Sequence, residues 1–217
     1  GMRYATVVIT PRDGGLNPAD AVLVESSTVE RDLVHQVNLL NDGTIVMLYS
    51  LRGEIDRAVE RLRDQDPVIA VDGSGEGEGL VYLHIEPDEI SARLMGIIQD
   101  NEVVLQTPLE CTRGGGIRVT IVGDDATIQR AIDEVPEGVR VSLEGIGDYH
   151  PEADKLYGAL TARQREVLEA AVEQGYYEVP RRATHEDIAE KVGLSAGTIG
   201  EHLRKVEGRV LSSLVTR

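Results

Sequence analysis

Apolar and polar residues alternate in short runs along the first two thirds of the chain, and helix-like segments separate these runs. Alternation with a period of two predicts β-strands, whereas apolar residues spaced three and four apart predict helices. Residues 2–75 follow the order strand, helix, strand, strand, helix, strand. The expected strands are 4–10, 29–40, 44–49 and 68–71, and the expected helices are 18–24 and 54–63. The glycine-rich run 73–79 predicts an exposed turn.

The same order of elements recurs in residues 76–148. The expected strands are 80–85, 103–111, 117–122 and 139–143, and the expected helices are 86–98 and 125–133. This β-α-β-β-α-β order is that of the ferredoxin-like fold, which ligand-sensing ACT-type modules also use. We therefore expect an α+β protein in which two ferredoxin-like modules, residues 2–75 and 76–148, precede a different domain.

The pattern changes after residue 148. Residues 149–152 predict a short linker, and residues 155–217 predict an all-α domain. Thr161 is a good N-cap for a long helix that ends at Gly175, and Thr184 begins a second helix with a capping-box pattern. Gly193 then favours a left-handed turn, after which Ser195 caps a third helix.

The second and third of these helices predict a helix-turn-helix. Their apolar residues form one small core around the turn: Ile188, Ala189, Val192, Leu194, Ile199 and Leu203. In such a motif the N-terminal part of the last helix enters the major groove of DNA. The predicted DNA-binding residues are Ser195, Gly197, Thr198, Gly200, Glu201, His202, Arg204 and Lys205, with Arg181 and Arg182 ahead of the second helix.

Within this set, the small residues Gly197 and Gly200 predict a close approach of the helix backbone to DNA. Thr198, Glu201 and His202 carry side chains that reach base edges, which is where sequence is read. The alternative is that three packed helices simply carry solvated charges. The combination of caps, turn and core spacing favours DNA binding.

The basic residues have a different expected role. Arg204 and Lys205 suit phosphate contacts, which supply affinity rather than sequence choice, and Arg181 and Arg182 suit a further pair of phosphates.

Two segments and the turn carry a resemblance to a known family. Residues 160–168 read LTARQREVL and residues 176–182 read YYEVPRR, and both precede the Gly-Leu-Ser turn. Residues 160–214 resemble the C-terminal helix-turn-helix of bacterio-opsin activator-like regulators of halophilic archaea. The preceding segment resembles, less specifically, the domain that accompanies this motif. The resemblance implies transcription regulation with double-stranded DNA as the partner.

The charge supports a division into two parts. The chain holds 22 Lys and Arg against 38 Asp and Glu, a net charge of −16, with no Phe and no Trp. This composition indicates adaptation to a high-salt cytoplasm, where salt screens self-repulsion; the alternative is an ordinary acidic protein. Residues 155–217 carry ten bases and nine acids, whereas residues 1–154 carry 12 and 29. Only the C-terminal part is therefore suited to approach a phosphate backbone.

Other reactive residues predict no catalytic or metal site. Cys111 is the one cysteine, which excludes a disulfide framework or a cysteine zinc site within one chain, and we expect a buried apolar role for it. The histidines lack ligand spacing, and the glycine run 73–77 lacks the Lys of a phosphate loop. We expect no enzyme, no cofactor, and a cytoplasmic protein without a membrane span.

Two features point to assembly and regulation. Val206, Val210 and Leu214 continue the apolar stripe of the third helix, which predicts either packing on the N-terminal part or pairing in a homodimer. A small-molecule effector that binds ACT-like modules is the alternative function, and the glycine loops 13–15 and 114–116 are its weak pointers. Glycine there is more typical of turns.

Overall fold

The computed structural model describes residues 1–215, except for the side chains of residues 152 and 154. It contains two compact units, Gly1–Tyr149 and a second that begins at His150. The final two residues of the predicted C-terminal domain, 216 and 217, lie outside the described residues. No helix in the described chain combines the length and hydropathy needed to cross a membrane.

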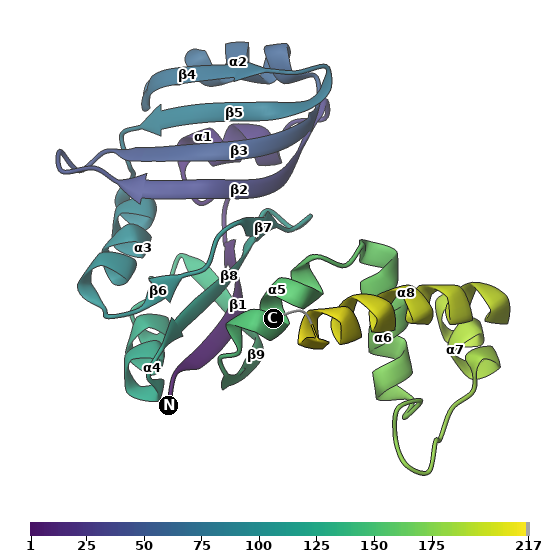
Figure 1. Cartoon of the computed structure of the whole chain (residues 1–217). Coiled ribbons are helices and arrows are strands. Elements are labelled where there is room, and N and C mark those ends of the chain that lie inside the picture. Colours follow the sequence, from purple (N-terminus) through teal and green to yellow (C-terminus); the bar gives the residue numbers. More distant parts are fainter. Residues whose placement is uncertain (216–217) are drawn as a thin grey trace. The chain divides into compact units, whose positions relative to one another are not determined.

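The N-terminal unit is a mixed α and β structure (Figure 1). Its strands are β1 (Arg3–Pro11), β2 (Val29–Leu39), β3 (Ile45–Gly53), β4 (Val68–Ser74), β5 (Gly77–Ile85), β6 (Val104–Leu105), β7 (Leu109–Cys111), β8 (Ile117–Gly123) and β9 (Val139–Asp148). Its helices are α1 (Pro18–Val24), α2 (Ile55–Arg63), α3 (Glu89–Asp100) and α4 (Asp125–Asp133).

All described strands join one antiparallel sheet in the order β4-β5-β3-β2-β7-β8-β1-β9, with β6 beside β8. The first strand of each half of the sequence lies among the strands of the other half. Thus β5 lies between β4 and β3, whereas β1 lies between β8 and β9. Pairing of β2 with β7 joins the two groups of strands. Strand pairing therefore crosses the division expected between residues 75 and 76.

Three local expectations about elements were wrong. The strand expected over 103–111 is two strands, because Pro108 cannot donate to a ladder. Strands β4 and β5 extend into the glycine run that was expected to be a turn, where the backbones approach so closely that a Cβ on Gly79 would lie 2.0 Å from the carbonyl oxygen of Ser74. The expected linker instead begins helix α5 (Pro151–Gly158), since proline is favoured in the first helical turn.

The core of the N-terminal unit lies where α1, α2, α3 and α4 pack on the sheet. Apolar residues at alternate positions of β3 and β5 face the helices. Ile45, Tyr49 and Leu83 in these strands are almost fully buried, whereas Tyr82, which alternates with Leu83, stays exposed. The period-two pattern in the sequence thus corresponds to one covered and one open face.

A buried ion pair lies at the edge of this core. Asp20 of α1 accepts a hydrogen bond from Arg31 of β2 at 3.1 Å and another from the hydroxyl of Tyr49 at 2.8 Å. The same guanidinium donates to the carbonyl oxygens of Thr112 and Gly116 at 3.2 and 3.1 Å. Both charged side chains are at most 4% exposed. The pair therefore joins α1, β2 and β3 to the turn between β7 and β8.

We predict that Asp20→Ala lowers the free energy of unfolding by about 3–5 kcal/mol, because it leaves the Arg31 charge buried without its partner. Asp32→Ala is the matched control, since it breaks an Asp–Arg pair in the same unit whose side chains are 42% and 55% exposed. That change should cost less than about 1 kcal/mol. Urea unfolding of the three proteins measures both values, and equal losses would contradict the role of the buried pair.

Candidate nucleic-acid interface

Three helices after α5 form the C-terminal core. They are α6 (Ala162–Glu173), α7 (His185–Val192) and α8 (Ala196–Val215). Their buried residues form one cluster, against which Val192 and Leu194 also pack: Val167, Ala170, Ala171, Tyr176, Ala183, Ile188, Ala189, Ile199 and Leu203. All six residues of the expected helix-turn-helix core thus belong to this cluster or pack on it.

Caps fix where each of these helices begins. The hydroxyls of Thr161 and Thr184 accept hydrogen bonds from the backbone of the third residue in α6 and α7, and the side chain of that residue bonds back to the cap. The backbone N–H and the hydroxyl of Thr184 also donate to the Asp187 carboxylate at 2.7 and 2.8 Å, and these two bonds lower the pKa of Asp187 because they favour its ionised form. Each helix start predicted from capping residues is confirmed.

The turn between α7 and α8 has the geometry that its residues require. Gly193 ends α7 with φ of 70°, a left-handed conformation that glycine adopts without strain. The hydroxyl of Ser195 then accepts a hydrogen bond from the backbone N–H of Thr198 at 3.2 Å and lies 2.7 Å from the hydroxyl of Thr198. The turn therefore sets where α8 starts and holds both hydroxyls at its N-terminus.

The N-terminal half of α8 presents four of the expected residues on an exposed face. Gly197, Glu201, Arg204 and Lys205 are exposed there. Lys205 donates a hydrogen bond to Glu201 at 2.6 Å, and this contact lowers the pKa of the Glu201 carboxyl. A Cβ placed on Gly197 would meet no atom within 4 Å. The absence of a side chain at Gly197 therefore serves no packing need inside this unit.

Three expected residues of α8 lie partly under the surface. Thr198, Gly200 and His202 are half-buried. A Cβ on Gly200 would lie 3.1 Å from Cε1 of His185 in α7, so this glycine permits close helix packing. The Nδ1 atom of His202 is buried, and it has no hydrogen-bond partner within the described part of the chain.

The loop between α6 and α7 holds the two remaining expected residues. Arg181 lies over the ring of Tyr176, with 4.2 Å from its guanidinium carbon to the ring centre. That ring stacks on His185, whose Nε2 is 2.8 Å from the Tyr176 hydroxyl. Arg182 forms an ion pair with Glu178. Sequence reasoning missed Tyr176 as the support of Arg181, although a tyrosine pair beside an arginine pair was visible in the loop.

Other reactive residues do not form a second centre. Burial raises the pKa of the Cys111 thiol from 9.0 to about 11, so the unreactive protonated form dominates near neutral pH. Within the described residues, no group of three or more His, Cys, Asp and Glu side chains is arranged to hold a metal ion.

Each of the two units matches a known family model. The family model described as HVO_0513, N-terminal, matches residues 17–149, and a helix-turn-helix DNA-binding domain model matches residues 160–212. The chain belongs to the HVO_0513 family. Its C-terminal domain is the helix-turn-helix of bacterio-opsin activator-like regulators of halophilic archaea, which confirms the resemblance seen in the sequence.

Three similar curated proteins come from Haloferax volcanii. A putative transcriptional regulator is 25% identical over 92% of the chain, which spans 29% of that relative. The transcriptional regulator NarO is 29% identical over 64% of the chain and 58% of its own length. A dimethyl sulfoxide reductase transcriptional activator is 33% identical over 44% of the chain and 48% of its own length. No solved structure matches.

Two glycine substitutions in α8 provide a test of the interface. Gly197 and Gly208 are both exposed, and a Cβ at either position meets no atom within 4 Å. Alanine at either site should stabilise the helix by up to about 1 kcal/mol. If the backbone near Gly197 lies against DNA, Gly197→Ala should weaken DNA binding at least about tenfold, since the added methyl group occupies the contact.

Gly208→Ala is the matched control and should leave DNA affinity unchanged. Thermal unfolding measures the gain in stability, and titration of a labelled DNA fragment measures affinity. Equal DNA affinities of the two variants would contradict a close backbone approach at Gly197.

Proposed function

We propose that the chain is a sequence-specific DNA-binding transcription regulator and that Ser195–Lys205 reads the major groove. The observation that supports this proposal most strongly is the two-sided arrangement of the first half of α8. Ile199 and Leu203 pack into the helix-turn-helix core, whereas the opposite face of the helix is exposed. The names of the curated relatives, which are transcriptional regulators or activators, support the same conclusion.

The basic side chains of the proposed interface differ in whether a carboxylate of the same chain already binds them. The side chain of Arg204 is exposed and makes no hydrogen bond or ion pair within the described part of the chain. Lys205 and Arg182 instead hold carboxylates of Glu201 and Glu178. These two must exchange an internal partner for DNA, so each gains less from a phosphate than Arg204 does. We infer that Arg204 supplies the largest electrostatic contribution.

Among the remaining expected residues, Glu201 is the best placed to contact base edges. Its carboxylate is exposed and ionised, which suits acceptance of a hydrogen bond from a cytosine amino group. Thr198 is already bonded to Ser195, and the Nδ1 atom of His202 is buried. A base contact from either residue therefore uses its remaining exposed atoms.

A pair of variants separates affinity from sequence choice. Arg204→Ala should lower affinity by a similar factor, about 3–30-fold, for every DNA sequence, whereas Glu201→Ala should change the preferred sequence by about 1–3 kcal/mol at one base pair. Selection of bound fragments from a random DNA pool, followed by titration at several salt concentrations, measures both effects. Arg57→Ala, which removes an exposed arginine of the N-terminal unit, is the control. Unchanged binding by both α8 variants would refute the proposal.

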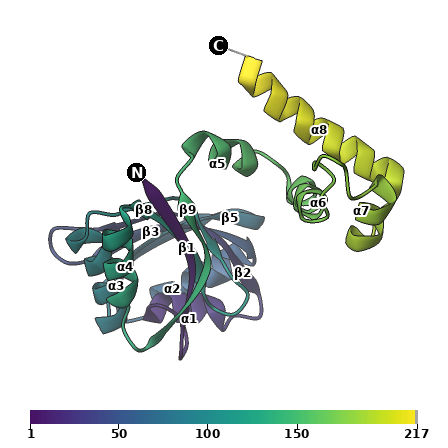
Figure 2. The same cartoon turned by 90° about the horizontal axis from the view of Figure 1, so that it is seen from below.

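We further propose that two chains pair through the end of α8. Figure 2 shows the second half of this helix extending beyond α6 and α7. Three apolar side chains there, Leu211, Leu214 and Val215, are 60%, 73% and 82% exposed. Exposed apolar residues grouped on one helix end are typical of an interaction surface, and a two-fold dimer suits a palindromic operator.

The variant Leu211→Glu/Leu214→Glu should convert a dimer into a monomer, because pairing would bury like charges. Val172→Glu is the matched control, since it places the same charge at an exposed apolar position of α6. Light scattering after size-exclusion chromatography gives the molar mass of each protein. A wild-type monomer, or a dimer that survives the double substitution, would argue against pairing through α8.

The N-terminal unit is proposed to be two ferredoxin-like repeats that have exchanged their first strands. In a ferredoxin-like sheet the first strand lies between the third and the fourth, and this is the place that β5 occupies between β3 and β4. Strand β1 has the equivalent place between β8 and β9. We assign this unit to regulation or oligomerisation, with binding of a small molecule as the alternative role.

The glycine loops give this alternative role little support. A Cβ on Gly15 would lie 2.3 Å from the backbone nitrogen of Ala21, and one on Gly116 would lie 2.7 Å from the carbonyl oxygen of Ile9. Both residues are thus needed for close backbone packing. A different part of the unit supports ligand binding.

A further inference from the structure

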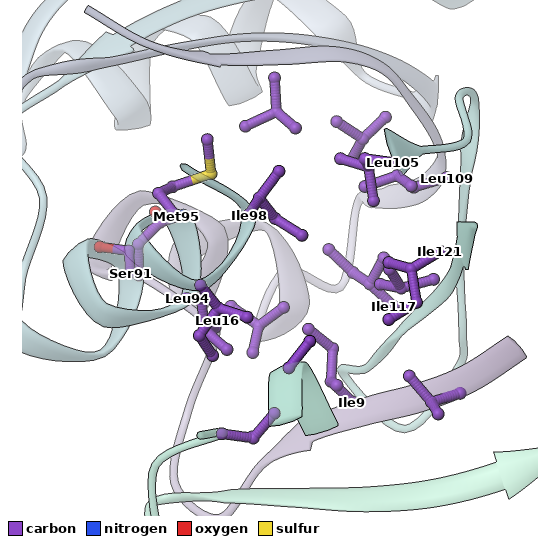
Figure 3. Close-up of a pocket in the computed structure, with 18 of the residues that line it drawn as sticks. Ile9, Leu16, Ser91, Leu94, Met95, Ile98, Leu105, Leu109, Ile117 and Ile121 are labelled. Carbon is purple, nitrogen blue, oxygen red and sulfur yellow. The ribbon is translucent and has the colours of Figure 1, made fainter. Parts of the chain in front are cut away.

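A partly open apolar cavity lies in the N-terminal unit, between α3, α4 and the sheet. Its volume is about 140 Å³. Figure 3 shows Leu94, Met95 and Ile98 of α3 on one side of it, and Ile9, Ile117 and Ile121 of the sheet on another. The lining includes strands from both halves of the sequence, so the cavity exists only because the halves share one sheet.

The few polar groups in the lining already have partners. The side chain of Asn17 accepts a hydrogen bond from the backbone of Asp20 at 2.8 Å, and the hydroxyl of Tyr49 donates to the Asp20 carboxylate. The hydroxyl of Ser91 bonds to Asp88 in the cap of α3. The lining contains no charged side chain, so the charges of an amino acid or a phosphorylated compound would be buried there without a partner.

Helix α3 packs less tightly on the sheet than α2 does. The inward apolar residues of α2, which are Ile55, Ala58, Val59 and Leu62, are all buried. Of the five α3 residues that line the cavity, Leu94, Met95 and Ile98 are half-buried, whereas Ser91 and Ile97 are buried. Met95 has a flexible side chain that adapts to irregular space. The empty volume thus lies beneath a helix whose side chains can close around an occupant.

We propose that this cavity binds a neutral, apolar small molecule of about the size of benzene. Engineered protein cavities of about 150 Å³ with similar linings stay dry and bind benzene or xenon. Binding fills the space under α3 and buries its half-exposed side chains. The role of this site as an effector site rests on the proposed regulatory function, whereas binding itself does not involve DNA.

Benzene is the probe, and isoleucine methyl groups are the reporters in NMR spectra of the full chain. We expect saturable shifts for Ile98, Ile117 and Ile121, with half-saturation at or below about 1 mM. Ile188 and Ile199 of the C-terminal unit, which are buried away from the cavity lining, are internal controls and should not shift. Benzoate, equal in ring size but charged, should bind at least about tenfold more weakly.

Two variants locate the site. Ala131→Leu adds volume to a lining residue that is 2% exposed and should abolish the benzene shifts. Leu94→Ala enlarges the cavity and should increase the affinity for naphthalene at least about tenfold. The proposal is overturned if benzene shifts no methyl group or shifts all of them equally. It is also overturned if benzoate binds as well as benzene, or if naphthalene affinity is unchanged in Leu94→Ala. DNA titration without benzene is a separate measurement, so failure of DNA binding is distinguishable from failure of the cavity.

Discussion

The buried contact between Asp20 and Arg31 constrains most of the N-terminal unit. Charges taken out of water are tolerated only when every remaining hydrogen-bonding group is satisfied. Here the carboxylate accepts hydrogen bonds from Leu16 in the loop before α1, from β2 and from β3, and the guanidinium reaches the carbonyls of Thr112 and Gly116 in the other half of the sequence. Because each of these hydrogen bonds requires a particular distance and direction, the ion pair fixes how α1 and the β7–β8 turn lie against the sheet. It also fixes one wall of the apolar cavity, through Asn17 and Tyr49.

The sequence predicts the helices and strands of this unit better than it predicts which strands pair with each other. Period-two alternation identifies most strands because one face of the sheet is covered, and capping residues identify helix starts. The positions of β5 between β3 and β4 and of β1 between β8 and β9 are invisible to such patterns, since each strand would be equally apolar in its own half. The importance of Arg31 is hidden for a similar reason. A single charge in an alternating strand looks solvated until the structure shows 4% exposure of its side chain.

The helix-turn-helix is local in sequence, and for that reason its core, caps and turn follow from residue spacing. What spacing does not show is which side of a neighbouring helix each small residue faces. Gly197 and Gly200 look equivalent in the sequence, yet only Gly200 lies against His185. The pair of Glu201 and Lys205 is different, because their i,i+4 spacing on a predicted helix already indicates the contact.

The distribution of charge explains why these internal pairs matter for DNA recognition. Residues 155–217 are almost neutral, and two of the four basic residues expected at the interface are held by carboxylates. Release of counterions from DNA, which normally drives binding, then contributes little, and it contributes less still at high salt. At the proposed interface, affinity must then come from shape and base contacts along α8. The backbone at Gly197 has no side chain to keep DNA at a distance, and the contacts between Ser195 and Thr198 hold the start of α8 in place. Both features favour shape and base contacts more than added positive charge would. An interface built in this way loses less affinity when salt rises, because few ions are exchanged on binding.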